Sequence, residues 1–210
     1  MKKIWLICLF TLAGLPIAAQ DIVYYNLKGF FAHSGDTIAA IRVEKRAKNQ
    51  IVLTGGADYR LSVDKNETLC RYLKKRSFLV KVDSALYVNC RKLRYKKLRF
   101  GAWFAPAMEL NGHIYFSAIP IGTVAAGPSS TMDVMLGGTL GDAIAASVQV
   151  KKRVYYEIDG TTGKVDFVGK EKMSALLSNQ PEWKEDYLNA DSESAELTGK
   201  YLWMLKRSKK

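Results

Sequence analysis

Short hydrophobic runs separated by turn-forming residues fill the chain from residue 20 to about residue 110. The runs are rich in aromatic and β-branched residues, and the sequences HSGD and TGGAD stand between them. This pattern is typical of strands joined by tight turns. It predicts strands at about 22–31, 38–45, 50–54 and 58–63 and further strand structure within 77–95, with one or two helical turns in ETLCRYLKK, residues 67–75.

Two hairpins are predicted from their turn residues. Asn111 and Gly112 lie between two apolar runs, and both residues accept the positive φ of a type I′ turn. His113 follows this turn directly, which favours a surface or edge role. The second hairpin has the turn DGTTG between strands at 152–158 and 164–168.

The last part of the chain, from residue 174, predicts two or three short helices. Pro181 suits a first helical turn, and Asp191 with the acids that follow it suits another helix start. Basic residues from Lys206 onward suit the end of the last helix, where the helix dipole favours positive charge.

A Gly/Ala-rich apolar segment precedes the second hairpin, and residues 132–150 within it favour a helix. On that helix Gly137, Gly141 and Ala145 form a smooth groove that permits close packing. The helix would be about 28 Å long, nearly a bilayer core, but Asp142 near its centre would cost about 2.5 to 3.5 kcal/mol in lipid. Burial inside the fold and insertion into a membrane therefore both stay open.

These elements predict an α+β fold with an antiparallel, β-rich N-terminal half and a C-terminal hairpin with short helices. Four regions follow from the pattern: a signal peptide at 1–19, a β-rich region at 20–116, the Gly/Ala-rich segment at 117–150, and the hairpin with helices at 151–210. We expect the second and fourth regions to form one compact unit.

The N-terminus has the layout of a secretory signal peptide. Lys2 and Lys3 precede sixteen uncharged residues, and small residues lead to a cleavage site after Ala19. The apolar run is short for a membrane span and contains Gly14 and Pro16. We therefore expect an exported protein, periplasmic or associated with the outer membrane.

Two cysteines, Cys70 and Cys90, remain after removal of the signal peptide. In an oxidising compartment they are candidates for a disulfide that closes a loop of about 20 residues and adds about 3 kcal/mol. The alternative is a pair of buried free thiols.

Positive charge is concentrated in one part of the chain. The net charge is +12, or +10 without Lys2 and Lys3, and residues 71–99 hold eleven basic residues against the single acid Asp83. Such a cluster attracts polyanions. Export makes nucleic acid a poor candidate and favours an anionic lipid or polysaccharide. The alternative is a solvated surface neutralised by acids at 182–196.

The binding residues predicted within this stretch are those at its C-terminal end, with aromatic side chains nearby for stacking on sugars or headgroups. The charges are Arg91, Lys92, Arg94, Lys96, Lys97 and Arg99, and the aromatic residues are Tyr95, Tyr87 and Trp103.

Catalytic and cofactor motifs are not found in the sequence. The glycines at 137, 138 and 141 lack the G-x-G-x-x-G spacing, and GPSST misses the G-x-S-x-G elbow. Two histidines and no H-E-x-x-H give no metal site, and no cofactor is predicted. A hydrolase with a carboxylate pair stays an alternative, because the spacing of such a pair is spatial.

The order of export signal, β-rich half, RVYYEIDGTTGKVDF hairpin and ALLSNQPEWKEDYL helices resembles a family of exported proteins of Gram-negative bacteria. No activity is established for that family, so the resemblance implies a periplasmic or outer-surface setting and assigns no functional residue.

Overall fold

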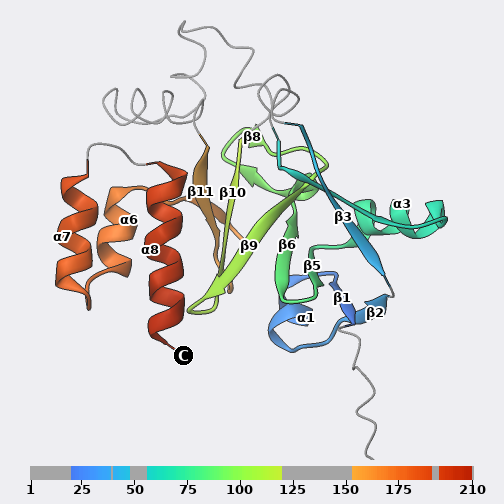
Figure 1. Cartoon of the computed structure of the whole chain (residues 1–210), viewed down its shortest axis with the longest axis horizontal. Helices are drawn as coiled ribbons and strands as arrows, with labels where there is room; N and C mark the ends of the chain where they lie inside the picture. The colour runs from blue at the N-terminus through green and yellow to red at the C-terminus, as the bar shows by residue number, and fades with distance from the viewer. Residues whose placement is uncertain (1–19, 39, 48–55, 120–152, 191–193, 210) are drawn as a thin grey trace, which may run out of the picture.

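An antiparallel sheet forms the centre of the protein, with helices at both of its ends (Figure 1). The structure is a computed structural model that describes residues 20–38, 40–47, 56–119, 153–190 and 194–209. The predicted α+β class, with a β-rich N-terminal half and C-terminal helices, is confirmed. Along the sheet the strands follow the order β12 (Val165–Phe167), β11 (Val154–Ile158), β10 (His113–Ala118), β9 (Phe104–Leu110), β6 (Ala85–Asn89), β5 (Leu79–Val82), β1 (Asp21–Tyr24) and β2 (Asp36–Ile38).

Two more strands, β3 (Ile41–Lys45) and β4 (Tyr59–Val63), branch from this path where Tyr59 pairs with Phe104 of β9. Helix α3 (Glu67–Arg76) packs beside β4. The predicted helix at 67–75 is thus confirmed, and β3 and β4 match two of the predicted strands. The strand predicted at 50–54 lies outside the described residues.

One face of the sheet carries a short helix, a 3-10 turn and a small hairpin. These are α1 (Leu27–Phe31), η1 (Cys90–Lys92), β7 (Arg94–Tyr95) and β8 (Leu98–Arg99). The strand predicted at 22–31 is therefore wrong beyond Tyr24. The reason is Asn26, whose Oδ1 accepts a hydrogen bond from Gly29 N at 2.7 Å and caps the start of α1.

Both predicted hairpins are present. Asn111 and Gly112 form the two-residue turn between β9 and β10, with φ of 55° and 76°, as a type I′ turn requires. Strands β11 and β12 pair across residues 159–164, where Asp159 Oδ1 accepts hydrogen bonds from Thr161 N at 2.9 Å and Thr162 N at 2.6 Å.

Three C-terminal helices cover the other face of β9, β10 and β11. They are α6 (Lys170–Leu176), α7 (Pro181–Asn189) and α8 (Ala195–Ser208). Pro181 opens α7 as predicted, whereas α8 is capped by Ser194. A Cβ at Gly199 would lie 2.8 Å from Tyr155 Oη, so the glycine allows α8 to approach β11 closely.

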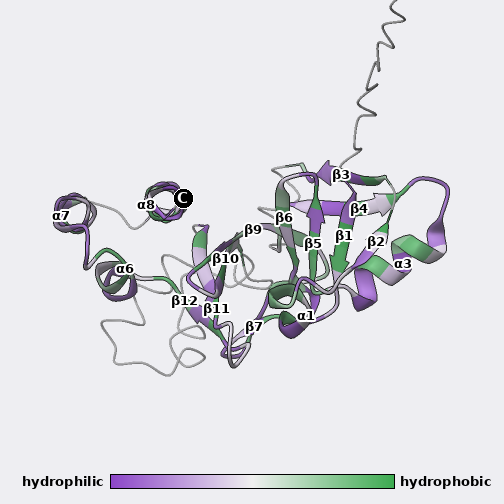
Figure 2. Cartoon of the chain, turned by 90° about the horizontal axis from the view of Figure 1, so that it is seen from below, coloured by the Kyte–Doolittle hydropathy of each residue, from purple (hydrophilic) through white to green (hydrophobic). Residues whose placement is uncertain are grey.

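Side-chain alternation along the strands separates three apolar clusters. Neighbouring residues of β1 and β5 divide between the cluster under α1 and the cluster under β3, β4 and α3. On β10, Ile114 and Phe116 face the first cluster, and Tyr115 faces a third cluster beneath α6, α7 and α8. Figure 2 shows the result: β3 and β4 lie on one side of the sheet, and α1 and β7 lie on the other.

Asn89, the last residue of β6, connects two of these layers. Its Nδ2 lies 3.1 Å from Lys74 O and 3.0 Å from Ser77 O, at the C-terminal end of α3, where helical carbonyls lack partners within the helix. Its Oδ1 accepts a hydrogen bond from Arg91 N at 3.1 Å and so begins η1. The side chain is only 4% exposed, so water does not replace these bonds.

We expect Asn89→Ala to lower the free energy of unfolding by about 3 kcal/mol, because buried carbonyls then lose their donor. Asn89→Asp should be at least as destabilising, since it keeps the shape but turns an acceptor toward carbonyl oxygens. Urea unfolding followed by circular dichroism measures both changes. Asn189→Ala, at an exposed end of α7, is the matched control and should be nearly neutral. Equal stability of the Asn89 and Asn189 variants would contradict the capping role.

Candidate functional site

The basic stretch 71–99 divides between two surfaces. Its first part lies on α3, whose Leu73 packs in the cluster under β3 and β4, and its last part forms η1, β7 and β8, where Cys90 and Leu93 pack in the cluster on the opposite face. The division occurs because the chain passes through β5 and β6 between them and turns at Asn89. The predicted charge cluster is therefore two separate clusters in space.

The second cluster, residues 91–99, is referred to below as the basic hairpin. Leu93 and Leu98 are buried in it, as is Phe100 directly after it, and Leu93 and Phe100 belong to the apolar cluster beneath. The six predicted cationic residues are all exposed: Arg91, Lys92, Arg94, Lys96, Lys97 and Arg99. The structure thus places all six on one small, well-anchored unit.

Among the residues that the structure describes, most of these cations have no acidic partner. Within the described part of the chain, Arg91, Lys92, Arg94, Lys97 and Arg99 form no salt bridge. The acids of α7 and of the start of α8 lie over the other face of the sheet, so they do not pair with the basic hairpin. Its positive charge therefore faces solvent.

The aromatic residues predicted for stacking are not gathered at the basic hairpin. Tyr95 is half-buried, its ring centroid is 5.6 Å from that of Tyr156, and burial raises the pKa of its hydroxyl. Lys96 Nζ lies 5.6 Å from the Tyr95 ring centroid. Tyr87 packs on Tyr59 under β4 on the other face. Only Tyr95 is thus part of the basic hairpin.

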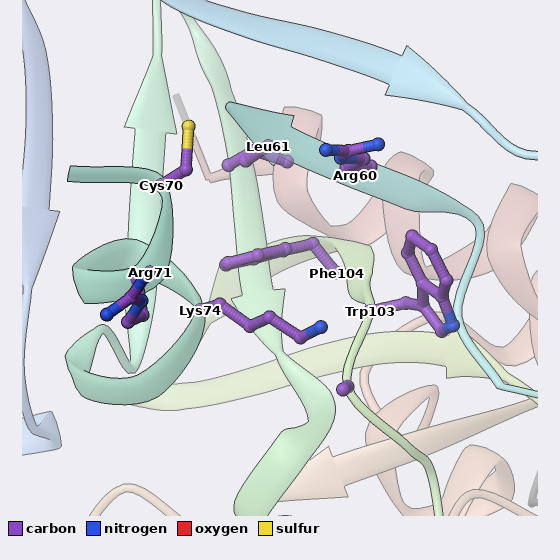
Figure 3. Close-up of a pocket in the computed structure, with 8 residues that line it drawn as sticks. Arg60, Leu61, Cys70, Arg71, Lys74, Trp103 and Phe104 are labelled. Carbon is purple, nitrogen blue, oxygen red and sulfur yellow. The ribbon is translucent and has the colours of Figure 1, made fainter. Parts of the chain in front are cut away.

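A cavity of about 410 Å³ lies beside the first cluster, between β4, α3 and the start of β9 (Figure 3). It is referred to below as the basic cavity. Its lining is Arg60, Leu61, Cys70, Arg71, Lys74, Ala102, Trp103 and Phe104. Trp103, predicted to stack at the basic stretch, is therefore part of this cavity. The contribution of Arg60, the neighbour of Leu61 on β4, was not predicted.

A mixed cluster of charged and polar side chains surrounds Glu157, which is 9% exposed. Tyr115 Oη donates a hydrogen bond to Glu157 Oε1 at 2.9 Å, and Lys172 Nζ binds Oε2 and also Asp166 at 3.1 Å. Burial lowers the pKa of Lys172, but these two carboxylates outweigh that effect and raise it overall. His113 Nδ1 lies 3.1 Å from Glu157 Oε1, so His113 belongs to this cluster. Lys172 thus pairs with both Glu157 and Asp166.

The disulfide predicted between Cys70 and Cys90 is not formed, and both cysteines are free. Cys70 Sγ accepts a hydrogen bond from Val63 N at 3.1 Å, on the face of β4 and α3. Cys90 is fully buried in the cluster on the other face, where desolvation raises the pKa of its thiol. Because a disulfide needs side chains that point toward each other, this placement corrects the prediction.

Thiol labelling checks this correction. Protein isolated from the producing cells and unfolded without reductant should carry iodoacetamide adducts on both Cys70 and Cys90, as measured by peptide mass spectrometry. In the folded protein, Cys70 should react much faster than Cys90, because reaction needs an accessible thiolate. A Cys70–Cys90 linked peptide would overturn the assignment.

The Gly/Ala-rich helix predicted at 132–150, with Gly137, Gly141 and Ala145, lies outside the described residues, and both of its alternatives stay predictions. Among the described helices, none is long and apolar enough to cross a membrane. In the described ranges, no group of three or more His, Cys, Asp or Glu side chains is arranged to hold a metal ion.

Comparison with known proteins gives one match. No curated protein and no solved structure matches the chain. A family model described as Family of unknown function (DUF6563) matches residues 22–209 and so spans the sheet, the basic hairpin, the basic cavity and the three C-terminal helices. The chain therefore belongs to this family of unknown function, DUF6563.

Proposed function

We propose that the protein is an exported, non-catalytic cell-envelope protein that binds an anionic envelope surface through the basic hairpin. The ligand would present repeated negative groups, as anionic lipid headgroups or an acidic polysaccharide do. The observation that carries the proposal is the set of five exposed cations without a salt bridge in the described part of the chain, held on one anchored hairpin. Such a group of charges attracts polyanions.

The contacts of the basic hairpin favour peripheral, electrostatic binding. Its large apolar side chains, Leu93 and Leu98, are buried and anchor it to the fold. The exposed large apolar side chains of the described residues are elsewhere: Phe31, Tyr72, Leu188 and Trp203. Binding should therefore weaken steeply with salt, because mobile ions screen exposed charges over about 10 Å at 0.1 M.

The backbone at Lys96 also supports a binding role. Lys96 has φ of 52° in the two-residue turn between β7 and β8, a left-handed conformation that favours glycine or asparagine. A side chain other than that of glycine or asparagine at this position costs stability, and the Lys96 ammonium lies beside the Tyr95 ring at the tip of the hairpin. Strain of this kind is frequent at functional sites.

We expect neutralisation of three cations, Lys96→Gln with Lys97→Gln and Arg99→Gln, to weaken binding to phosphatidylglycerol vesicles about 100-fold. Each cation near an anionic membrane contributes about 1 kcal/mol, so three contribute about 3 kcal/mol. Cosedimentation with these vesicles, with neutral phosphatidylcholine vesicles and with alginate separates lipid from polysaccharide binding.

The matched control removes three exposed cations of the same stretch outside the hairpin: Lys75→Gln, Arg76→Gln and Lys81→Gln. It changes the net charge equally and should lose much less binding. If the hairpin variant bound vesicles and alginate as well as the unmodified protein does, the proposal would be wrong.

We expect the single change Lys96→Gly to separate stability from binding. It should raise the free energy of unfolding by about 1 kcal/mol, because glycine accepts the left-handed conformation without a steric penalty. It should also weaken vesicle binding about fivefold through loss of one cation. Thermal unfolding and cosedimentation measure the two effects. A variant that is less stable, or that binds more tightly, would argue against the role of Lys96.

The signal peptide predicted at 1–19 supports the envelope location. Cell fractionation tests this part of the proposal. The protein should lack residues 1–19 and should leave the envelope fraction in high salt. Release only by detergent would favour the alternative of a membrane element at 132–150.

A further inference from the structure

We propose that the basic cavity is a second, separate binding site that takes one acidic sugar unit, a ring of hexose size that carries a carboxylate or a phosphate. The inference goes beyond the proposed function, because the cavity lies between β4 and α3, and its Leu61 and Phe104 belong to the cluster on the face opposite the basic hairpin.

The lining of the cavity has the charge that an anion needs. Arg60 extends from β4, and Arg71 and Lys74 extend from neighbouring turns of α3. No carboxylate belongs to the lining, and these three cations form no salt bridge within the part of the chain that the structure describes. Arginine can bind a carboxylate or phosphate through two parallel hydrogen bonds, and lysine adds a point charge.

An apolar wall completes the cavity. Leu61 and Phe104 are 4% and 2% exposed and form its floor, and Figure 3 shows Lys74 extending across Phe104 toward Trp103. An indole beside a cation suits a sugar ring with one anionic substituent. The sugar ring packs on the indole, and its anionic group pairs with the cation.

Trp103 is held in place before any ligand binds. The guanidinium carbon of Arg46 lies 4.5 Å from the Trp103 ring centroid, and Arg46 Nη1 donates a hydrogen bond to Ala57 O at 2.9 Å. Gly56, with φ of 92°, permits this packing: a Cβ there would lie 3.3 Å from Arg46 Nη1 and 3.4 Å from Trp103 Cδ1. A wall fixed in this way loses little conformational freedom on binding.

The volume of the basic cavity limits the size of the ligand that it can hold. About 410 Å³ is near the lower end of the range of small-molecule sites, about 300 to 1,000 Å³. One sugar unit fits that volume, and a longer chain of units would have to extend into solvent. The cavity therefore suits a monosaccharide or the end of a polymer.

Isothermal titration calorimetry of the full protein with glucuronic acid, glucose 6-phosphate and glucose tests the proposal. The two acidic sugars should bind, and neutral glucose should bind at least about tenfold more weakly, because it cannot pair with the cations. Tryptophan fluorescence should change on binding, and the change should be absent in Trp103→Phe. Comparison of the two acids distinguishes a carboxylate from a phosphate ligand.

Paired variants assign the binding to the cavity. Arg71→Ala with Lys74→Ala should weaken binding of the acidic sugars about tenfold or more. The matched control, Lys75→Ala with Arg76→Ala, changes two exposed residues of the same helix that do not line the cavity and should leave binding unchanged. Circular dichroism verifies that α3 stays folded in both. Arg60→Ala, on a different element, provides a test that does not alter the helix.

Four outcomes would overturn the inference: no binding of either acid at about 10 mM, equal binding of glucose, equal loss in both paired variants, or unchanged binding in the Arg71 and Lys74 variant and in Arg60→Ala. The basic-hairpin variant at Lys96, Lys97 and Arg99 should keep sugar binding while it loses vesicle binding. The failure of this inference is thereby distinguishable from the failure of the proposed function.

Discussion

The buried amide of Asn89 is the interaction on which both charged surfaces depend. Its nitrogen satisfies carbonyls at the end of α3, and its oxygen begins the 3-10 turn that leads into the basic hairpin. One side chain therefore holds the end of the helix that supplies Cys70, Arg71 and Lys74 to the basic cavity, and it also holds the start of the basic hairpin on the opposite face. Because an amide carries donors and an acceptor on one planar group, Asn89 satisfies both sides at once.

The separation of the basic residues changes how the charge acts. Eleven cations within 29 residues form a single cluster in the sequence, but β5 and β6 divide them between two faces of the sheet. On one face they line a cavity with Trp103, and on the other they cover a convex hairpin. A concave site selects one compact group, whereas an exposed hairpin attracts extended surfaces.

Local patterns predicted much of the fold because their physics is local. The Asn111-Gly112 turn forms because both residues accept a positive φ. Pro181 suits the first turn of α7 because a backbone N–H at that position has no partner within the helix. Helix α1 was missed because Phe30 and Phe31 resemble strand residues, although Asn26 offered a cap. The exposure of the basic hairpin followed from its composition. The basic cavity and the faces of Cys70 and Cys90 depend on contacts between distant elements, such as Tyr59 with Phe104.

The pairing of β10 with β11 has a consequence for the architecture of the chain. Ala118 and Val154 are partners in adjacent strands, so the chain that connects them starts and ends at neighbouring points of the sheet. The entropy of closing such an excursion grows only with the logarithm of its length. The register of β10 with β11 is set by the strands themselves, so a change in the length of the connection between them should cost little stability.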